Sequence, residues 1–72
     1  MIDSVGEQIA VRAQAALRNS PFSDLRELDV RRDGDTLHLT GRVSSFYHKQ
    51  LAQEAIRAIA DGWCVVNEVS VD

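Results

Sequence analysis

The stretch 28–45 alternates aliphatic and polar side chains on both sides of an Asp33-Gly34 pair, and this pattern predicts a β-hairpin. With Asp33-Gly34 as a two-residue type I′ turn, all the aliphatic residues of both strands fall on one face. That register pairs Val30 with Leu37, Leu28 with Leu39, and Asp29 with His38. Gly34 is then a structural residue, because the turn needs a positive φ. A hairpin with one apolar and one polar face requires helices on a single side.

The length and cysteine content limit how such a hairpin is stabilised. A chain of 72 residues forms one domain, which we expect to cover residues 1–72. Hydrophobic residues make up 44% of the chain and there is one proline, so the sequence is too apolar to be disordered. The single cysteine, Cys64, excludes an intramolecular disulfide, and one cysteine with two distant histidines falls short of a zinc site. We therefore expect no metal, no cofactor and a fold that depends on regular packing of helices on the sheet.

Apolar residues recur at helical spacing in two segments, one from about residue 4 to residue 18 and one between the Ser44-Ser45 pair and Gly62. The segment between the first helix and the hairpin carries Phe22 and Leu25, which we expect to close one end of the core. A β-branched run over 64–71 predicts a third strand. The pattern indicates an α+β fold of order α-β-β-α-β, with two helices packed on one face of a three-stranded mixed sheet. If the third strand joins the hairpin beside its first strand, the right-handed crossover through the second helix places both helices on the same side.

The charge pattern argues against a nucleic-acid partner. The chain has 8 basic and 11 acidic residues, a net charge of −3, so no phosphate-binding surface extends over the whole domain. Four arginines on or beside the hairpin alternate with acidic residues, which favours cross-strand charge pairs. An RNA-binding module of the KH type needs a Gly-x-x-Gly clamp, and the sequence has none.

No apolar run in the sequence approaches the roughly 20 residues that a membrane-spanning helix needs. The first residues have neither the basic region nor the long apolar region of a secretory signal. From this we expect either a cytoplasmic protein or a domain cut from a longer chain.

Five motifs follow one another in the order of a known bacterial domain. A helix ends in Ala-Leu-Arg-Asn-Ser-Pro and is followed by an extended Leu-x-Val. Residues 33–45 then read Asp-Gly-x-x-Leu-x-Leu-x-Gly-x-Val-Ser-Ser, a second helix carries Ala-x-x-Ala-Ile, and the chain closes on Val-Val-Asn-Glu-Val-x-Val. Over nearly its whole length the sequence resembles a BON domain. The most specific parts of the match lie at 37–43 and 66–69.

The resemblance implies a non-enzymatic module of bacterial envelope proteins, often periplasmic, that binds phospholipid membranes or mediates protein contacts. One place departs from the family pattern, which usually has two residues between Gly-Val and the valine before asparagine. Here Trp63 follows Gly62 where the pattern has valine, and Cys64 and Val65 are the two residues before Val66-Asn67. We therefore expect the connection between the second helix and the last strand to depart from that of the family at Gly62-Trp63.

Two further residues have an expected structural role. Gly41 interrupts an alternating strand, where a glycine leaves room for a helix backbone or marks a bulge. Asn67 interrupts the parity of the valines in the last strand, and we expect a bulge or a polar position there.

No reactive site is evident among the cysteine and the histidines. Cys64 stands beside Trp63 and Val65 at the start of an apolar strand, and no neighbouring residue type activates its thiol. We expect a buried or half-buried structural cysteine rather than a partner of His38 or His48. His38 lies opposite Asp29 in the predicted register, which favours a cross-strand hydrogen bond. We expect no catalytic residue and no enzyme.

The start of the second helix is the predicted contact site. Its residues combine amphipathic aromatic side chains with local basic charge, a combination suited to a lipid headgroup interface: Arg42, Phe46, Tyr47 and Lys49. In the alternative interpretation the two aromatic residues pack over the end of the hairpin. The expected partner is a phospholipid surface or an envelope protein. A protein-interaction or self-assembly module, which would use the sheet edges, stays open as the alternative function, and the oligomeric state is open.

Overall fold

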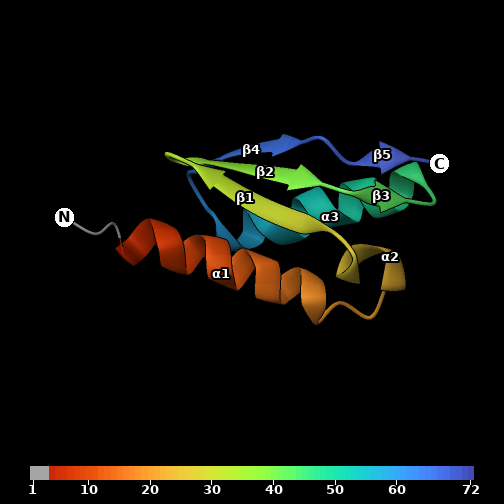
Figure 1. Ribbon diagram of the computed structural model, residues 1–72, viewed down its shortest axis with the longest axis horizontal. Helices are drawn as coiled ribbons and strands as arrows, with labels where there is room; N and C mark the ends of the chain where they lie inside the picture. The colour runs from red at the N-terminus through yellow and green to blue at the C-terminus, as the bar shows by residue number, and fades with distance from the viewer. Residues whose placement is uncertain (1–3) are drawn as a thin grey trace.

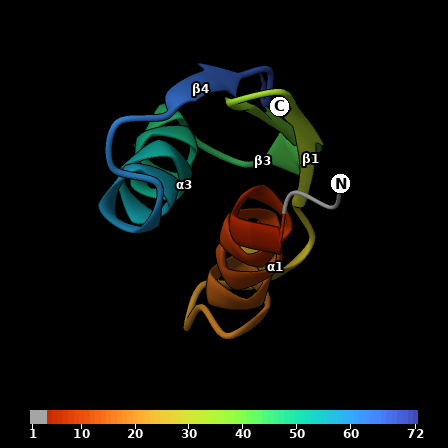
Figure 2. The ribbon, with the colours of Figure 1, turned by 90° about the vertical axis from the view of Figure 1, so that its left-hand side faces the viewer.

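A computed structural model describes residues 4–72 of the chain, and it confirms the α+β class. Two long helices lie on the same side of the sheet, as Figure 1 and Figure 2 show from two directions. The elements are α1 (Ser4–Arg18), α2 (Ser23–Arg26), β1 (Asp29–Asp33), β2 (Thr36–Thr40), β3 (Arg42–Val43), α3 (Phe46–Ile59), β4 (Cys64–Asn67) and β5 (Ser70–Val71). The predicted order lacked three short elements, α2, β3 and β5.

The sheet is mixed, as predicted, and its last strand does not join the hairpin beside the first strand. The three-stranded sheet has the order β1-β2-β4, and β3 and β5 form a separate parallel pair. β1 and β2 are antiparallel, and β4 runs parallel to β2. The last strand therefore lies beside the second strand of the hairpin, not the first. The outer margin of β1 is not free to receive it, because side chains of α1 already bond to that margin.

The hairpin register differs from the predicted one by two residues. Val30 pairs with Leu39, Asp33 pairs with Thr36, and the turn consists of Gly34-Asp35. Gly34 has φ +63° and no described residue other than glycine has a positive φ, so the turn has the type II′ pattern with glycine in its first position. This arrangement avoids a positive φ at an aspartate, whereas the predicted type I′ turn would require one.

A shift of two residues leaves each side chain on its predicted face but changes the pairs across the strands. His38 lies opposite Arg31 rather than Asp29. Its Nδ1 lies 2.8 Å from Glu68 Oε1, at the end of β4. The predicted pair of His38 with Asp29 is therefore wrong, because the register that would have formed it does not occur.

Gly41 separates β2 from β3 and has φ +128°, a conformation that L side chains rarely adopt. A Cβ at this position would lie 2.7 Å from Leu28 Cδ2 and 3.4 Å from Leu28 Cα. The space left by the missing side chain is thus filled by Leu28, just before β1, and not by a helix backbone.

The core lies between the sheet and the two long helices. Its buried apolar residues come from α1, α2, the strands and α3: Ala13, Leu17, Leu25, Leu28, Leu37, Leu39, Val43, Ala52, Ile56, Ala60 and Val69. The four-residue helix α2 contributes Leu25, which is 3% exposed and closes one end of the core as expected. The same expectation is wrong for Phe22, which is 38% exposed. Strand alternation places Cys64 on the opposite face of the sheet from Val65, and its side chain is exposed. The expectation of a buried or half-buried cysteine is therefore wrong.

The connection between α3 and β4 is short. Gly62 has φ +83°, and the Trp63 N–H donates to Ala60 O at 3.0 Å. Trp63 is half-buried against the core, and Arg32 Cζ lies 5.7 Å from the centroid of its ring. A β1 side chain and the residue before β4 therefore meet at the hairpin end of the sheet.

Candidate functional site

The start of α3 exposes two aromatic side chains. Ser45 caps the helix, and its hydroxyl accepts a hydrogen bond from the His48 N–H at 3.2 Å. Phe46 and Tyr47 then lie in the first turn, outside the helix face that carries the buried Ala52 and Ile56. Phe46 is 76% exposed and Tyr47 is 64% exposed. The alternative interpretation, in which both pack over the hairpin, does not describe these positions.

A carboxylate beneath this turn holds it in place. Asp24 Oδ2, in α2, accepts hydrogen bonds from the Ser44 N–H at 2.7 Å and from Ser44 Oγ at 2.6 Å. His48 Nδ1 lies 2.9 Å from the same oxygen and donates to it. The hydrogen bonds from Ser44, followed by that from His48, lower the pKa of Asp24 to about 2. The ionised carboxylate therefore ties α2 to the segment that leads from β3 into α3.

The ring of His48 lies near two other aromatic rings. Its centroid is 5.2 Å from that of Phe22 and 5.8 Å from that of Tyr47. Phe22, which precedes α2, is 38% exposed. We call the surface formed by Phe22, Phe46 and Tyr47 the aromatic end. It lies at the end of the molecule where Figure 1 shows α2, β3 and β5.

The two predicted cations lie on either side of the exposed aromatic turn. Arg42, in β3, has a side chain that is 74% exposed, and its nearest carboxylate oxygen, on Asp72, is 3.8 Å away. Such a distant exposed pair leaves the guanidinium available to an anion. Lys49 is half-buried on α3 and makes no ion pair with any residue from 4 to 72. Of the four predicted contact residues, Arg42, Phe46 and Tyr47 are thus exposed and Lys49 is half-buried.

Asn67 links the break between β4 and β5 to α3. Its Nδ2 donates to Lys49 O at 3.0 Å and to Gln53 Oε1 at 3.2 Å, and its Oδ1 accepts from the Val69 N–H at 3.2 Å. The side chain therefore satisfies groups on both the helix and the strand. These contacts describe a positioning role for the half-buried side chain of Asn67.

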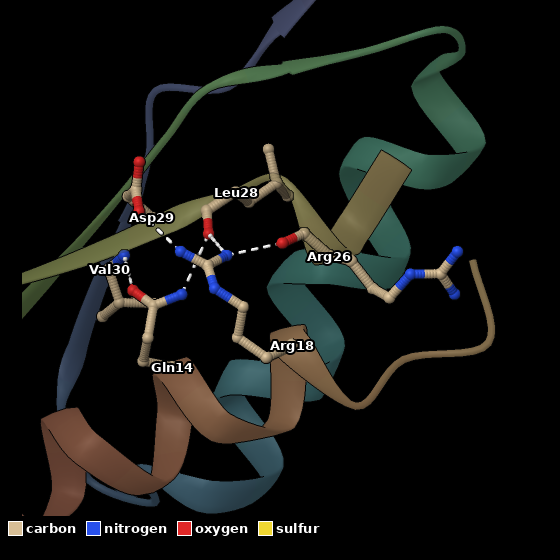
Figure 3. Close-up of polar contacts among 6 residues, drawn as sticks. All are labelled: Gln14, Arg18, Arg26, Leu28, Asp29 and Val30. Atoms are coloured by element: carbon tan, nitrogen blue, oxygen red, sulfur yellow. Dashed lines mark hydrogen bonds and ion pairs between the residues drawn. The ribbon is translucent and has the colours of Figure 1, made fainter. Parts of the chain in front are cut away.

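A second polar cluster lies along the outer margin of β1, and sequence reasoning missed it (Figure 3). The Gln14 side chain forms two hydrogen bonds with this margin, donating to Leu28 O and accepting from the Val30 N–H, both at 2.9 Å. Arg18 donates to Leu28 O at 2.7 Å and, through its other terminal nitrogen, to Asp29 Oδ1 at 3.0 Å. Gln14 and Arg18 occupy polar positions of a helix in the sequence, and no motif distinguishes them from the other polar residues there.

The described part of the chain offers no enclosed reactive site. No group of three or more metal-ligating side chains occurs among residues 4–72. A hollow of about 380 Å³ lies on the outer surface of α1, where Glu7, Gln8, Val11 and Arg12 line it, away from the aromatic end. None of the helices described in residues 4–72 has the length and apolarity needed to cross a bilayer. The aromatic end is an exposed surface of the domain.

Comparison with known proteins identifies the family. The family model of the BON domain matches residues 6–72, and the chain belongs to this family. The family is consistent with a non-enzymatic binding module, as the exposed surface also is. A stretch of 40 residues is 45% identical to the tRNA pseudouridine synthase A of Acidiphilium cryptum strain JF-5. That stretch covers 56% of this chain but only 16% of the enzyme.

Proposed function

We propose that this domain is a non-enzymatic binding module whose aromatic end contacts the surface of an anionic phospholipid bilayer. The observation that supports the proposal is the exposure of Phe46 and Tyr47 on a turn held by hydrogen bonds. An apolar ring that is 76% exposed loses unfavourable hydration when it enters the interface between headgroups and acyl chains. Tyr47 suits the same depth, because its ring is apolar and its hydroxyl is polar.

Electrostatics adds a smaller contribution at the same place. Arg42 and Lys49 lie on the two sides of the exposed turn, and each basic residue near an anionic membrane surface contributes about 1 kcal/mol. The domain as a whole carries a net charge of −3, so this attraction is local and opposed by the rest of the molecule. Binding is therefore weak, sensitive to salt and dependent on orientation. The likeness of the sequence to envelope modules supports a bilayer at the bacterial envelope as the partner.

Vesicle flotation tests the proposal directly. The purified domain is mixed with phosphatidylcholine vesicles, with or without phosphatidylglycerol, at low and at physiological salt. We expect flotation with the anionic vesicles alone, and weaker flotation at the higher salt. Phe46→Ser with Tyr47→Ser should abolish flotation, and Arg42→Ala with Lys49→Ala should reduce it.

Val11→Ser is the matched control, because Val11 is a 68% exposed apolar residue on α1, far along the chain from the aromatic end. Its flotation should equal that of the unchanged domain. Flotation that is equal with neutral vesicles, or that Val11→Ser also removes, would contradict recognition at the aromatic end. A complete absence of flotation would favour the second kind of partner, a protein that buries the same aromatic rings.

A further inference from the structure

The outer margin of β4 presents backbone groups with no partner in the described chain. The N–H groups of Cys64 and Glu68 donate to Asp35 O and Leu39 O, at 3.1 and 2.9 Å, so these residues face the hairpin. Backbone groups alternate in direction along a strand, so Val65 and Asn67 direct their N–H and C=O groups outward. Within residues 4–72 no hydrogen bond reaches these four groups. Figure 1 shows β4 at the outer margin of the sheet.

This margin lacks the features that usually prevent strand addition. Strand β4 has the sequence Cys-Val-Val-Asn, with no charge and no proline, and only its shortness protects it. Beyond Asn67 the pattern of free groups stops, because the Val69 N–H already donates to Asn67 Oδ1. An added strand could therefore form up to four hydrogen bonds with Val65 and Asn67. That length corresponds to a short extended peptide.

The charge distribution indicates what kind of peptide fits. Residues 1–57 contain eight acidic and eight basic side chains, whereas residues 58–72 contain three acidic side chains and no lysine or arginine. Of these three acids, Asp61 makes no ion pair within residues 4–72, whereas Glu68 lies 2.8 Å from His38 Nδ1 and Asp72 lies 3.8 Å from Arg42. The three acids stand on both sides of β4, Asp61 before it and Glu68 and Asp72 after it. A second copy of the domain would bring two such acidic segments together, which disfavours self-pairing.

We propose that the outer margin of β4 binds an extended peptide segment of a partner protein by strand addition. The segment is uncharged and β-branched at its centre and carries lysine or arginine at both ends. Main-chain hydrogen bonds to Val65 and Asn67 supply the attachment, and Asp61 before the strand and the exposed Glu68 after it attract the basic ends. The site uses backbone groups of β4 and not the exposed rings of the aromatic end, and it does not depend on membrane binding.

The test uses the full 72-residue chain and a synthetic peptide with blocked ends. The peptide has a central Val-Thr-Val-Thr-Val run with two lysines on each side. We expect saturable changes in the amide resonances of Val65 and Asn67 during an NMR titration. A peptide with glutamates in place of the lysines should bind roughly tenfold more weakly or not at all. A lysine peptide with N-methyl groups on alternate residues of its pairing edge should not bind, because it cannot donate.

The variant Val65→Pro tests the same margin from the side of the protein. Proline removes an N–H that the sheet does not use, so we expect the domain to fold and to lose the peptide. If this variant does not fold, the N-methylated peptide still tests with the unchanged protein whether main-chain hydrogen bonds are needed for binding. Equal binding of the glutamate peptide, or resonance changes centred on Phe46 and Tyr47, would overturn the proposal. Concentration-dependent pairing of the free domain through Val65 and Asn67 would also overturn it, in favour of a second copy.

Discussion

The two margins of the three-stranded sheet differ in whether their outward backbone groups have hydrogen-bond partners. At β1 a glutamine and an arginine of α1 bond to the outward backbone groups, with Gln14 taking the place of a neighbouring strand at Leu28 and Val30. At β4 the outward groups of Val65 and Asn67 have no partner within residues 4–72. The difference shows that a helix beneath a sheet can protect one edge with amide side chains and leave the other available for pairing.

The largest expected effect concerns the glycine that lets β1 approach the rest of the hairpin. Gly41→Val should lower the free energy of unfolding by about 3 kcal/mol or more, because it combines a positive φ with a clash against Leu28. Urea denaturation measures the loss. Gly34→Ala is the control, since its φ is also positive but open space surrounds it, and it should cost only about 1 kcal/mol. Equal losses of stability for the two variants would show that the contact with Leu28 adds nothing to the cost of the positive φ at Gly41.

A pair of proline substitutions compares the two margins directly. Val30→Pro removes an N–H that donates to Gln14 and leaves the Gln14 oxygen unpaired, so it should cost about 2 to 3 kcal/mol. Val65→Pro removes an outward N–H that has no partner within residues 4–72, and it should cost about 1 kcal/mol, mostly from lost packing of a half-buried valine. Both values come from denaturant unfolding. A Val65→Pro variant as unstable as Val30→Pro would mean that the margin of β4 is not free.

Substitution of Gln14 tests whether its side chain protects the outer margin of β1. Gln14→Ala should cost about 2 kcal/mol, because the Val30 N–H loses its acceptor while Leu28 O keeps the bond from Arg18. Amide hydrogen exchange at Val30 should become faster in the same variant. Gln8→Ala, an exposed position of the same helix, should change stability by no more than about 0.5 kcal/mol. Unchanged exchange at Val30 would assign the protection of β1 to something other than Gln14.

The hairpin and α2 show where prediction from sequence succeeds and where it fails. The alternation around Gly34 predicts the two faces of the hairpin correctly, because a strand has a period of two residues. It does not decide between turns at 33–34 and 34–35, since a shift of two residues preserves both faces. The four residues of α2 are too few to show a helical period.

Long-range partners were the hardest to predict. The role of Gln14 depends on a strand 14 to 16 residues away in the chain, and no local pattern reveals it. The place of β4 beside β2 follows from the occupied margin of β1, so it could not be predicted before that margin was known. At the aromatic end, the residues around the helix start predict Phe46 and Tyr47 as contact residues, whereas Phe22 was expected in the core and is exposed. The Asp24 contacts beneath them join residues 20 and 24 positions apart and were not predicted.

The smallest expected effect concerns the Asp24 carboxylate, which joins α2 to the start of α3. Asp24 lies in α2, which leads into β1, and it bonds to Ser44 and His48 at the start of α3, which leads to β4. Its pKa falls from 3.8 to about 2, so the folded state favours the ionised form. The resulting stability is fully present above pH 3.8 and is lost as the pH falls toward about 2.

Urea unfolding at several pH values should therefore show a steeper loss of the free energy of unfolding over this range for the unchanged domain than for Asp24→Asn. Asp33→Asn, in the hairpin, serves as the control and should keep the steeper loss. If Asp24→Asn lost stability as steeply as the unchanged domain, the contacts of Asp24 would not be the source of the pH-dependent stability.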